Sequence, residues 1–367
     1  MAKGIKLKEY DYQSVQATSE AIFKAMGCRA EDARQITDIL LRADLRGIKT
    51  HGLMRLKEYY RLRKLDKINV KPVIRILHQT PSTALLDADK SLGMVAGTRA
   101  MHLAIEKARS VGTGWTAVRN SNHFGIAGAY AMMALEEDMI GITMTNANPL
   151  VAPTYSLKPL LGTNPIAVAI PAGEEPPLVA DFATSPIARG KLDVMHKQGE
   201  TAPVGLLQDE QGKPTIEANI LTRNGSIRTL GGEKETGGHK GFCMSAIVDI
   251  LSAVLSGANF GPTVTPTLGY LAGEKKAEED KGIGHFFGAM RIDAFQTARE
   301  FKEQMDHWIK VFRESDPVIG QERIVVPGDP EREHEAHYNA RQTIPLMEDV
   351  VEKTREIGKE LGVAGKL

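Results

Sequence analysis

The glycine motif Gly-Thr-Gly-Trp-Thr-Ala at residues 112–117 constrains the fold of this chain more than any other single feature. It matches the G-x-G-x-x-A fingerprint of dinucleotide-binding folds, which follows a strand and opens a helix so that a phosphate meets the helix N-terminus. Here the order is reversed, because a helical pattern at 93–111 precedes the glycines and the strand-like run WTAVRN follows them. The motif therefore predicts a helix cap and a turn into a strand at Gly112 and Gly114. A dinucleotide, if one binds, must be held by another element.

Apolar side chains recur at helical spacing toward both ends of the chain. Residues 13–26 and 30–46 show a period near 3.6, and a third helix is expected to begin with Thr50 as its N-cap. Amphipathic patterns return at residues 293–314 and 344–361. Both ends are therefore predicted to be mostly helical.

Strand-like runs alternate with helical patterns in the middle of the chain, between residues 83 and 182. Residues 195–240 are rich in Gly, Lys, Glu and Thr and predict long loops, whereas residues 242–256 predict one buried helix. We therefore expect a mixed α/β fold in three parts. Their limits are 1–75 plus 295–367 for a helical domain, 76–125 for a small α/β segment, and 126–294 for a sheet domain.

The charge balance and the cysteine content exclude several classes of protein. Forty-six basic residues balance 46 acidic ones, so no net field draws the chain to nucleic acid or to an anionic membrane. Cys28 and Cys243 are too few for a disulfide framework and fit reduced cytosolic thiols. The longest apolar segment is interrupted by Asp249 and is too short to span a bilayer, and the start lacks the apolar stretch of a signal peptide. We expect a cytoplasmic protein that binds neither nucleic acid nor membrane.

The stretch GIKTHGLMRL, residues 47–56, carries a first candidate centre. On the expected helix, His51 and Arg55 are four residues apart and share one face. A histidine exchanges a proton near neutral pH, and an arginine fork holds a carboxylate through two hydrogen bonds. The pair suits a 2-oxo or 2-hydroxy acid. A capped helix start with a solvated polar face explains the same residues.

A second candidate centre follows an apolar run in AVRNSNHFG, where His123 lies in a segment that leaves a strand. Such segments often line sites, although a loop histidine satisfied by backbone groups fits equally well. Thr163 and Asn164 stand directly before another strand-like run. Their side chains suit a ribose or an amide, or they shape a turn.

Charged residues in VADFATSPIARGK and GGHKGF suggest anion or cofactor contacts. Asp181 lies within an apolar run, so it needs a partner such as an imidazole, a hydroxyl or a ribose. Ser185, Arg189 and Lys191 follow in a segment suited to phosphates, unless it is a structural turn with solvated bases. His239 and Lys240 precede the expected helix at 242–256, where they form either an anion site or a hinge.

Metal-dependent and serine-dependent chemistry receive little support. EHEAH places His334 and His337 in a charged tail without the H-E-x-x-H spacing, so we expect an exposed polar helix or linker and no metal. The chain also contains no G-x-S-x-G nucleophile elbow.

Six blocks in order between about residues 40 and 295 resemble one known family. They are RADLRGIKTHGLMRL, RNSNHFGIAGAYAMMA, LLGTNPIAVAIP, DFATSPIARGK, GGHKGFCMSAIVDILSAVLSGA and GIGHFFGAMRIDAF, and the tail PGDPER fits too. The family is the malate/L-lactate dehydrogenase family of ketoacid reductases. It includes malate, sulfolactate and ureidoglycolate dehydrogenases, diketogulonate reductase and piperideine-carboxylate reductase.

The resemblance implies a non-Rossmann fold, in which residues 126–294 hold NAD or NADP on a largely antiparallel central sheet. It also implies a helical domain built from both chain ends and a homodimer. It assigns catalysis to His51, as proton donor and acceptor, and to His123. The implied substrate contacts are Arg55, which binds the carboxylate, together with His123, Tyr59 and Asn148. The expected cofactor contacts are Thr163, Asn164, Asp181, Ala183, Thr184, Ser185, Arg189, His239, Lys240, Gly328 and Asp329.

These residues predict reversible hydride transfer between the nicotinamide and C2 of a small 2-oxo or 2-hydroxy carboxylate. Some members place a lysine near position 147 or 148, but Ala147 and Asn148 stand here, which disfavours the ureidoglycolate reaction. Three alternatives remain: an NADPH-dependent reductase of piperideine-2-carboxylate, a non-catalytic dinucleotide-binding sensor, and a metal-dependent hydrolase.

Overall fold

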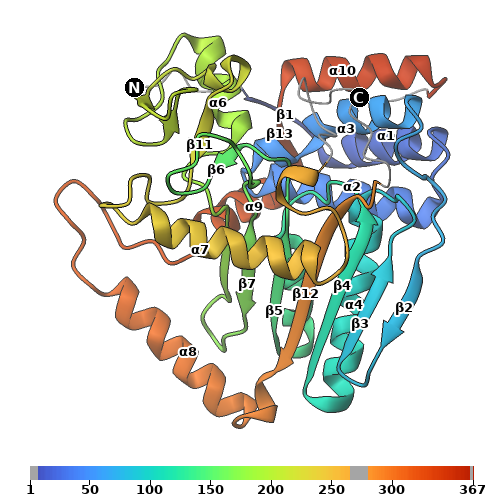
Figure 1. The fold of residues 1–367 in the computed structure, drawn as a ribbon. Coiled ribbons are helices and arrows are strands. Elements are labelled where there is room, and N and C mark those ends of the chain that lie inside the picture. Colours follow the sequence, from blue (N-terminus) through green and yellow to red (C-terminus); the bar gives the residue numbers. More distant parts are fainter. Residues whose placement is uncertain (1–6, 265–279, 364–366) are drawn as a thin grey trace.

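The computed structural model describes residues 7–264, 280–363 and 367, and it shows a mixed α/β protein built around one large sheet (Figure 1). The sheet has seven strands in the spatial order β2, β3, β4, β12, β5, β7 and β8. Their bounds are Arg75–Gln79, Thr83–Asp87, Thr113–Ser121, Ile283–Arg291, Met139–Thr145, Ile166–Ile170 and Leu178–Phe182. Every neighbouring pair is antiparallel except β3 with β4, which is parallel. The predicted mixed α/β class is confirmed.

The glycine motif lies where helix α4 (Gly93–Val111) turns into strand β4. Gly112 has a φ of 90° and its N–H bonds the carbonyl of Ala108, so it ends the helix in the left-handed conformation that glycine adopts readily. A Cβ on Gly114 would lie 1.9 Å from the carbonyl oxygen of Ala104. Only glycine therefore lets β4 lie this close to α4. The predicted cap and turn are confirmed, and α4 is the helix that the sequence pattern indicated.

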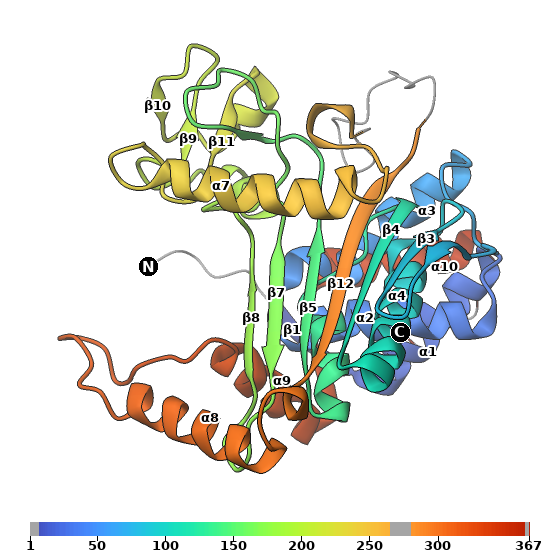
Figure 2. The same ribbon diagram turned by 60° about the horizontal axis from the view of Figure 1, so that its bottom comes forward.

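Helices from both chain ends lie together beside the sheet (Figures 1 and 2). They are α1 (Tyr12–Ala25), α2 (Ala30–Leu45), α3 (Leu56–Lys64), α9 (Asp329–Arg341) and α10 (Glu348–Glu360). Strand β1 (Leu7–Asp11) pairs with β13 (Thr343–Met347) in antiparallel register and so ties the two ends together. The pattern at 344–361 thus divides into a strand and a helix.

Helix α8 (Ala298–Arg313) lies away from α1 and α2 in both views (Figures 1 and 2). Its Asp306 accepts hydrogen bonds from the N–H groups of Gly173 and Glu174, each at 2.8 Å, in the turn between β7 and β8. The limits of the three predicted parts stay a prediction.

The expectation of long loops over residues 195–240 is wrong in part. Helix α6 (Arg189–Gln198) enters this stretch, and a second sheet forms from short strands. These are β6 (Val151–Ala152), β9 (Leu207–Gln208), β10 (Pro214–Thr215) and β11 (Ser226–Arg228). Strands of two or three residues are too short for an alternating apolar pattern, so the sequence carried no signal for them.

The segment predicted as one buried helix is helical, but it is buried on one face only. It forms α7 (Gly238–Asp249) and a π-helical turn, η5 (Ile250–Val254). Ser245, Val248 and Ser252 are buried, whereas Ile247 and Leu255 are 53% and 57% exposed. The prediction failed because the segment is apolar on nearly every side, and such a pattern does not tell which face packs inward.

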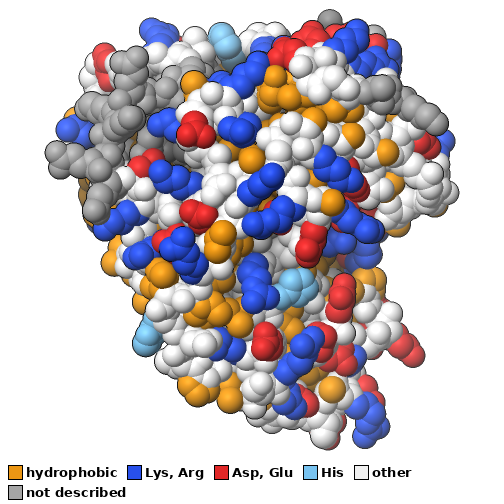
Figure 3. Space-filling view, turned by 90° about the vertical axis from the view of Figure 1, so that its right-hand side faces the viewer, with side chains coloured by type: hydrophobic (Ala, Val, Ile, Leu, Met, Phe, Trp, Pro, Cys, Tyr) orange, Lys and Arg blue, Asp and Glu red, His pale blue; other side chains and the backbone are white. Residues whose placement is uncertain are grey.

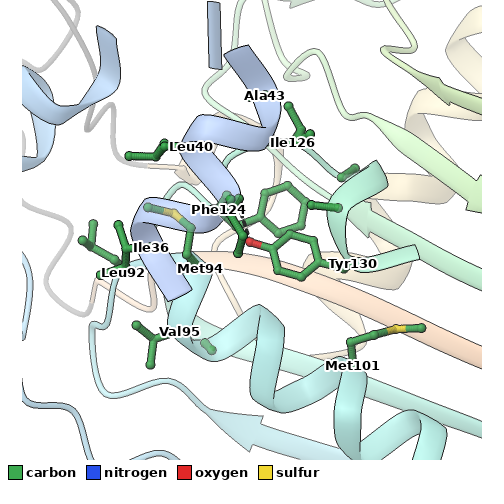
Figure 4. Close-up of a cluster of buried hydrophobic side chains, with 14 of the residues drawn as sticks. Ile36, Leu40, Ala43, Leu92, Met94, Val95, Met101, Phe124, Ile126 and Tyr130 are labelled. Atoms are coloured by element: carbon green, nitrogen blue, oxygen red, sulfur yellow. Dashed lines mark hydrogen bonds between the residues drawn. The ribbon is translucent and has the colours of Figure 1, made fainter. Parts of the chain in front are cut away.

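The main core lies between α2, α4 and the sheet, and it includes α5 (Gly128–Ala131) (Figure 4). Phe124 and Tyr130 pack there among side chains of α2 and α4, with their ring centroids 4.9 Å apart. The Tyr130 hydroxyl donates to the carbonyl of Phe124. Burying such a side chain stabilises a fold by roughly 1.5–3 kcal/mol. This core therefore holds the segment around His123 in one place.

The surface carries no dominant charge on the face shown in Figure 3, where Lys and Arg side chains are interspersed with Asp and Glu side chains. Among the residues described, no helix has both the length and the apolar character needed to cross a membrane.

Candidate active site

The chain between α2 and α3 does not form the helix that the sequence predicts. Two short 3-10 turns, η1 (Lys49–His51) and η2 (Leu53–Arg55), flank Gly52, and α3 begins only at Leu56. Gly52 has a ψ of −149°, which no helix allows, and the Leu53 N–H donates to the Asp44 carboxylate at 2.7 Å. The expectation that Thr50 caps a helix, with His51 and Arg55 on one helical face, is therefore wrong.

A cavity of about 120 Å³ nevertheless brings His51 and Arg55 together with residues from distant parts of the chain. Four other predicted site residues line it: His123, Asn148, Thr163 and Arg189. They come from the segments that follow β4 and β5, from the segment before β7, and from the start of α6. A single water needs about 10–15 Å³ of such space, so the cavity has room for a small molecule.

The imidazole rings of His51 and His123 stack in this cavity, with centroids 5.4 Å apart and planes at 20°. His123 Nδ1 lies 2.7 Å from the Tyr59 hydroxyl and accepts the N–H of Gly125 at 3.3 Å. A backbone N–H is only a donor, so Nδ1 of the neutral ring is the acceptor and Nε2 carries the proton. His123 is thus both a cavity residue and a histidine with a backbone partner.

Burial makes both imidazoles uncharged at neutral pH. Desolvation, with the Arg55 charge as a smaller cause, lowers the pKa of His51 to about 3. Desolvation also holds the pKa of His123 well below its usual range, and the neighbouring His51 and Arg55 act in the same direction. Thr50 Oγ1 lies 2.8 Å from His51 Nδ1 and orients that ring. The site therefore contains a neutral base beside a permanent cation.

Two guanidinium groups line the cavity. Arg55 Nε donates to the carbonyl of Thr50 at 2.6 Å, which holds the side chain in place. Arg189, the first residue of α6, lies 3.6 Å from Asp193. An arginine fork fits a carboxylate better than any other side chain does. The cavity therefore suits an anionic molecule.

The polar side chains beside the cavity divide into unpaired and satisfied groups. The buried Oδ1 of Asn148 has no hydrogen-bond partner among the described residues, so it can accept an N–H or O–H from a bound molecule. Asn164 is fully buried, accepts the Ala147 N–H at 3.1 Å and donates to the Ser245 carbonyl at 3.1 Å. The Thr184 hydroxyl donates to the Asn164 carbonyl at 3.0 Å. Asn164 and Thr184 thus shape the cavity wall from behind.

The remaining predicted cofactor residues do not line this cavity. Asp181 accepts the N–H of Gly128 at 2.7 Å, and burial raises its pKa to about 6, so its partner is a backbone amide at the start of α5. Ala183 follows β8, and the Ser185 hydroxyl donates to the Ile187 carbonyl at 3.2 Å. His239 and Lys240 are exposed in the first turn of α7.

The tail of the chain is organised by ion pairs and helix contacts. Gly328 caps α9 with a φ of 96°, and Asp329 bonds Arg313 at 2.7 Å and Arg332 at 2.8 Å. His334 lies within α9, where its Nδ1 is 2.5 Å from the carbonyl of Leu45. Within the described parts of the chain, no group of three or more His, Cys, Asp or Glu side chains could hold a metal ion.

His285, a fully buried histidine in β12, was not among the residues predicted from the sequence. Its Nδ1 lies 2.7 Å from Thr145 Oγ1 and its Nε2 lies 2.7 Å from Ser121 Oγ, and burial lowers its pKa to about 3. It stacks on Phe124 at 4.7 Å and so supports the segment that carries His123. A polar residue within the apolar run GHFFGAM was the available signal.

A small cavity with a neutral imidazole base, a second imidazole donor and an arginine fork defines a class of site. Such a site is suited to acid/base chemistry at an oxygen beside a carboxylate. The family model described as malate/L-lactate dehydrogenase matches residues 10–355 of this chain.

The relatives of this chain agree with that match. A malate dehydrogenase of Pyrococcus abyssi is 42% identical over 350 residues, which cover 94% of this chain and 92% of that protein. An L-sulfolactate dehydrogenase of Methanocaldococcus jannaschii is 37% identical over 343 residues, covering 93% and 94%. The crystal structure of malate dehydrogenase from Entamoeba histolytica superimposes with a TM-score of 0.91 at 33% identity, covering 99% of this chain and 100% of that chain.

The chain belongs to the malate/L-lactate dehydrogenase family. It is an enzyme, an oxidoreductase that acts on a hydroxy acid, as the sequence predicted. Membership implies a nicotinamide dinucleotide cofactor and a small carboxylate substrate.

Proposed function

We propose that this enzyme transfers a hydride between NAD or NADP and C2 of a short 2-hydroxy or 2-oxo acid that carries two anionic groups. One observation supports this choice: Arg55 and Arg189 line the same cavity of about 120 Å³ as the uncharged His51 and His123. One guanidinium matches the carboxylate next to C2, and the other matches a second acid group. Malate-type and sulfolactate-type acids meet this description, whereas a lactate-type acid has no second acid group to offer the other guanidinium.

The cofactor, when bound, supplies or accepts the hydride. The unpaired Oδ1 of Asn148 and the hydroxyl of Thr163 fit an amide or hydroxyl at the cavity, which makes the residues present suitable for such a group. Other contacts remain part of the proposal, on a non-Rossmann sheet. They are Asn164, Asp181, Ala183, Thr184, Ser185, His239, Lys240, Gly328 and Asp329, whereas Arg189, which the family resemblance gave as a cofactor contact, is assigned here to the second acid group of the substrate.

In the oxidation of a hydroxy acid, neutral His51 takes the hydroxyl proton while Arg55 holds the carboxylate. In the reverse direction His51 gives that proton to the oxygen at C2. A negatively charged substrate beside His51 raises the pKa of its imidazole, so the keto acid and a proton bind together. Such acid/base catalysis is typically worth about 100- to 10,000-fold in rate.

We propose that His123 donates a hydrogen bond to the same substrate oxygen. Its Nδ1 is occupied by Tyr59 and Gly125, so its Nε2–H is the donor for the oxygen as negative charge develops there. Tyr59 is fully buried and does not line the cavity, so we propose that it acts on the substrate through His123.

The test is a panel of acids with NADH and NADPH, followed at the absorbance of the reduced nicotinamide. Oxaloacetate and sulfopyruvate should be reduced with a kcat/KM at least about 10-fold above that of pyruvate, the difference expected for one charged hydrogen-bonded contact. Faster reduction of piperideine-2-carboxylate would establish the imine reductase instead, although that molecule has no second acid group to contact Arg189. Cofactor binding without turnover on any acid would indicate a sensor, and chelator-sensitive hydrolysis would indicate a metal enzyme.

We also propose a homodimer and a cytoplasmic location. The exposed Ile247 of α7, Ile250 and Val254 of η5, and Leu255 directly after η5 form an apolar surface that a second copy would cover. Both cysteines are free, which fits a reducing compartment. Light scattering of the purified enzyme decides the first point, because a monomer at micromolar concentration contradicts it.

A further inference from the structure

Asp44 lies at the end of α2, outside the cavity and beneath the loop that carries His51 and Arg55. Its side chain is almost completely buried, at 3% exposure. A Cβ built on Gly52 would lie 2.2 Å from Oδ2, 2.3 Å from Cγ and 2.4 Å from Oδ1 of Asp44. The loop thus rests on this carboxyl group at Gly52, where the absence of a side chain allows the close approach.

The carboxyl group also holds the loop by a hydrogen bond. Oδ2 of Asp44 accepts the N–H of Leu53 at 2.7 Å in a buried environment. The Lys49 ammonium donates to the carbonyl of Asp44 at 2.6 Å and to the carbonyl of Pro345 in β13 at 2.9 Å. The segment between α2 and α3 is therefore attached to the end of α2 and to β13.

The attachment point lies between the two site residues in the chain. His51 precedes Gly52 directly, and the Arg55 N–H bonds the Gly52 carbonyl at 3.0 Å. The Arg55 side chain reaches back to the carbonyl of Thr50 at 2.6 Å. A shift of Gly52 and Leu53 therefore moves the imidazole and the guanidinium relative to each other.

We propose that Asp44 is a positioning residue, whose carboxyl group beneath Gly52 sets the separation of His51 and Arg55 at the cavity. The inference rests on the proposed function, which assigns the proton to His51 and the substrate carboxylate to Arg55. Packing alone does not explain a carboxyl group here, because a buried acid costs free energy that an apolar side chain of similar size does not. Burial raises the pKa of Asp44 to about 7, which reflects that cost.

The experiment compares Asp44→Asn, Asp44→Ala, Gly52→Ala and the double variant Asp44→Ala/Gly52→Ala in full-length enzyme. Steady-state kcat and KM with oxaloacetate, NADH affinity by fluorescence, and thermal melting are measured for each. Asp44→Asn keeps an acceptor oxygen and should stay within about 3-fold of wild type, since a neutral hydrogen bond replaces a charged one. Asp44→Ala should lose about 100-fold in kcat/KM with little change in NADH affinity, as expected for a misplacement near 1 Å.

The double variant separates positioning from general packing. Gly52→Ala alone should be as damaging as Asp44→Ala, because its new Cβ meets the carboxyl group. Both changes disturb the same contact, so the double variant should lose about 100-fold, no more than either single variant. Two independent packing defects predict losses that multiply to about 10,000-fold. A multiplied loss overturns the proposal.

Asp32→Ala is the matched control, because Asp32 is a buried acid on the same helix, 8% exposed, and does not line the cavity. It should leave kcat/KM unchanged. If Asp44→Ala does not fold, Asp44→Asn and Gly52→Ala still test the proposal. Loss of activity in Asp44→Asn without a loss in Gly52→Ala refutes the positioning role of Asp44. The variant His51→Gln, measured in the same series, keeps the proposed function and the proposed role of Asp44 distinguishable. Retained activity there contradicts the proposed function, whereas wild-type kinetics of folded Asp44→Ala contradict only the role of Asp44.

Discussion

Substitution of His51 by Gln should change how the stability of the substrate-free enzyme depends on pH. Burial lowers the pKa of this histidine from 6.5 to about 3 in the folded protein. The folded state therefore binds fewer protons than the unfolded chain between these values. The contribution of neutral His51 to stability is complete above pH 6.5 and is lost as the pH falls through 6.5 toward 3.

The size of the effect follows from the two pKa values. Between pH 7 and pH 5 a single histidine with this shift loses about 2 kcal/mol of unfolding free energy. The other buried groups with shifted pKa values, such as His285, Asp44 and Asp181, are present in both proteins. Their contributions cancel when the change of unfolding free energy with pH in the variant is subtracted from the same change in wild type.

The assay is urea unfolding at pH 7 and pH 5, followed by far-UV circular dichroism without cofactor or substrate. Between pH 7 and pH 5 the unfolding free energy of His51→Gln should fall by about 2 kcal/mol less than that of wild type. The kcat of this variant should be about 100- to 10,000-fold below that of wild type. Equal losses of stability in the two proteins would show that His51 is not a desolvated neutral imidazole. The proton chemistry proposed for it would then lose its physical basis.

Three further substitutions probe the cavity. Arg55→Lys replaces a fork by a point charge and should lower kcat/KM for keto acids about 10- to 100-fold while NADH binding stays unchanged; an unchanged kcat/KM would contradict the carboxylate clamp. Arg189→Gln should lower kcat/KM for oxaloacetate about 10-fold or more and leave pyruvate reduction nearly unchanged, and equal effects on both acids would remove Arg189 from the second acid group. Tyr59→Phe should cut kcat about 10-fold through His123. Tyr60→Phe is its control, because that hydroxyl bonds Glu360 at 2.9 Å and does not line the cavity; equal kcat values in the two variants would argue against the tyrosine contact.

Local pattern identified much of the fold. The 3.6-residue period located α1, α2 and α4, and the order of helix, glycines and strand around Gly112 excluded a phosphate-binding turn there. Pattern failed where it was too short or too uniform. The strands of the second sheet are two or three residues long, and the α7 segment is apolar on nearly every side, so neither gave a periodic signal that could be resolved.

The site shows the same division. Residue type and chain order singled out His51, Arg55, His123 and Arg189, and all four line one cavity. The predicted arrangement of these residues was wrong, because the helix expected from Thr50 is interrupted at Gly52. The buried carboxyl group of Asp44, nine residues before Leu53, accepts the Leu53 N–H there. Nothing in the ten residues around His51 indicates that contact.

The sequence by itself determined which side chains are available for proton transfer and carboxylate binding, and which segments are helix or strand, since both depend on residue type and on neighbours a few positions away. Only the tertiary structure decided that two histidines 72 positions apart stack as neutral rings. It also decided that Tyr59 and Gly125 leave one ring nitrogen of His123 as a donor. The enclosure of His285 between strands is a third such feature. Desolvation and hydrogen-bond geometry arise from atoms that distant segments bring together, and no local pattern carries that information.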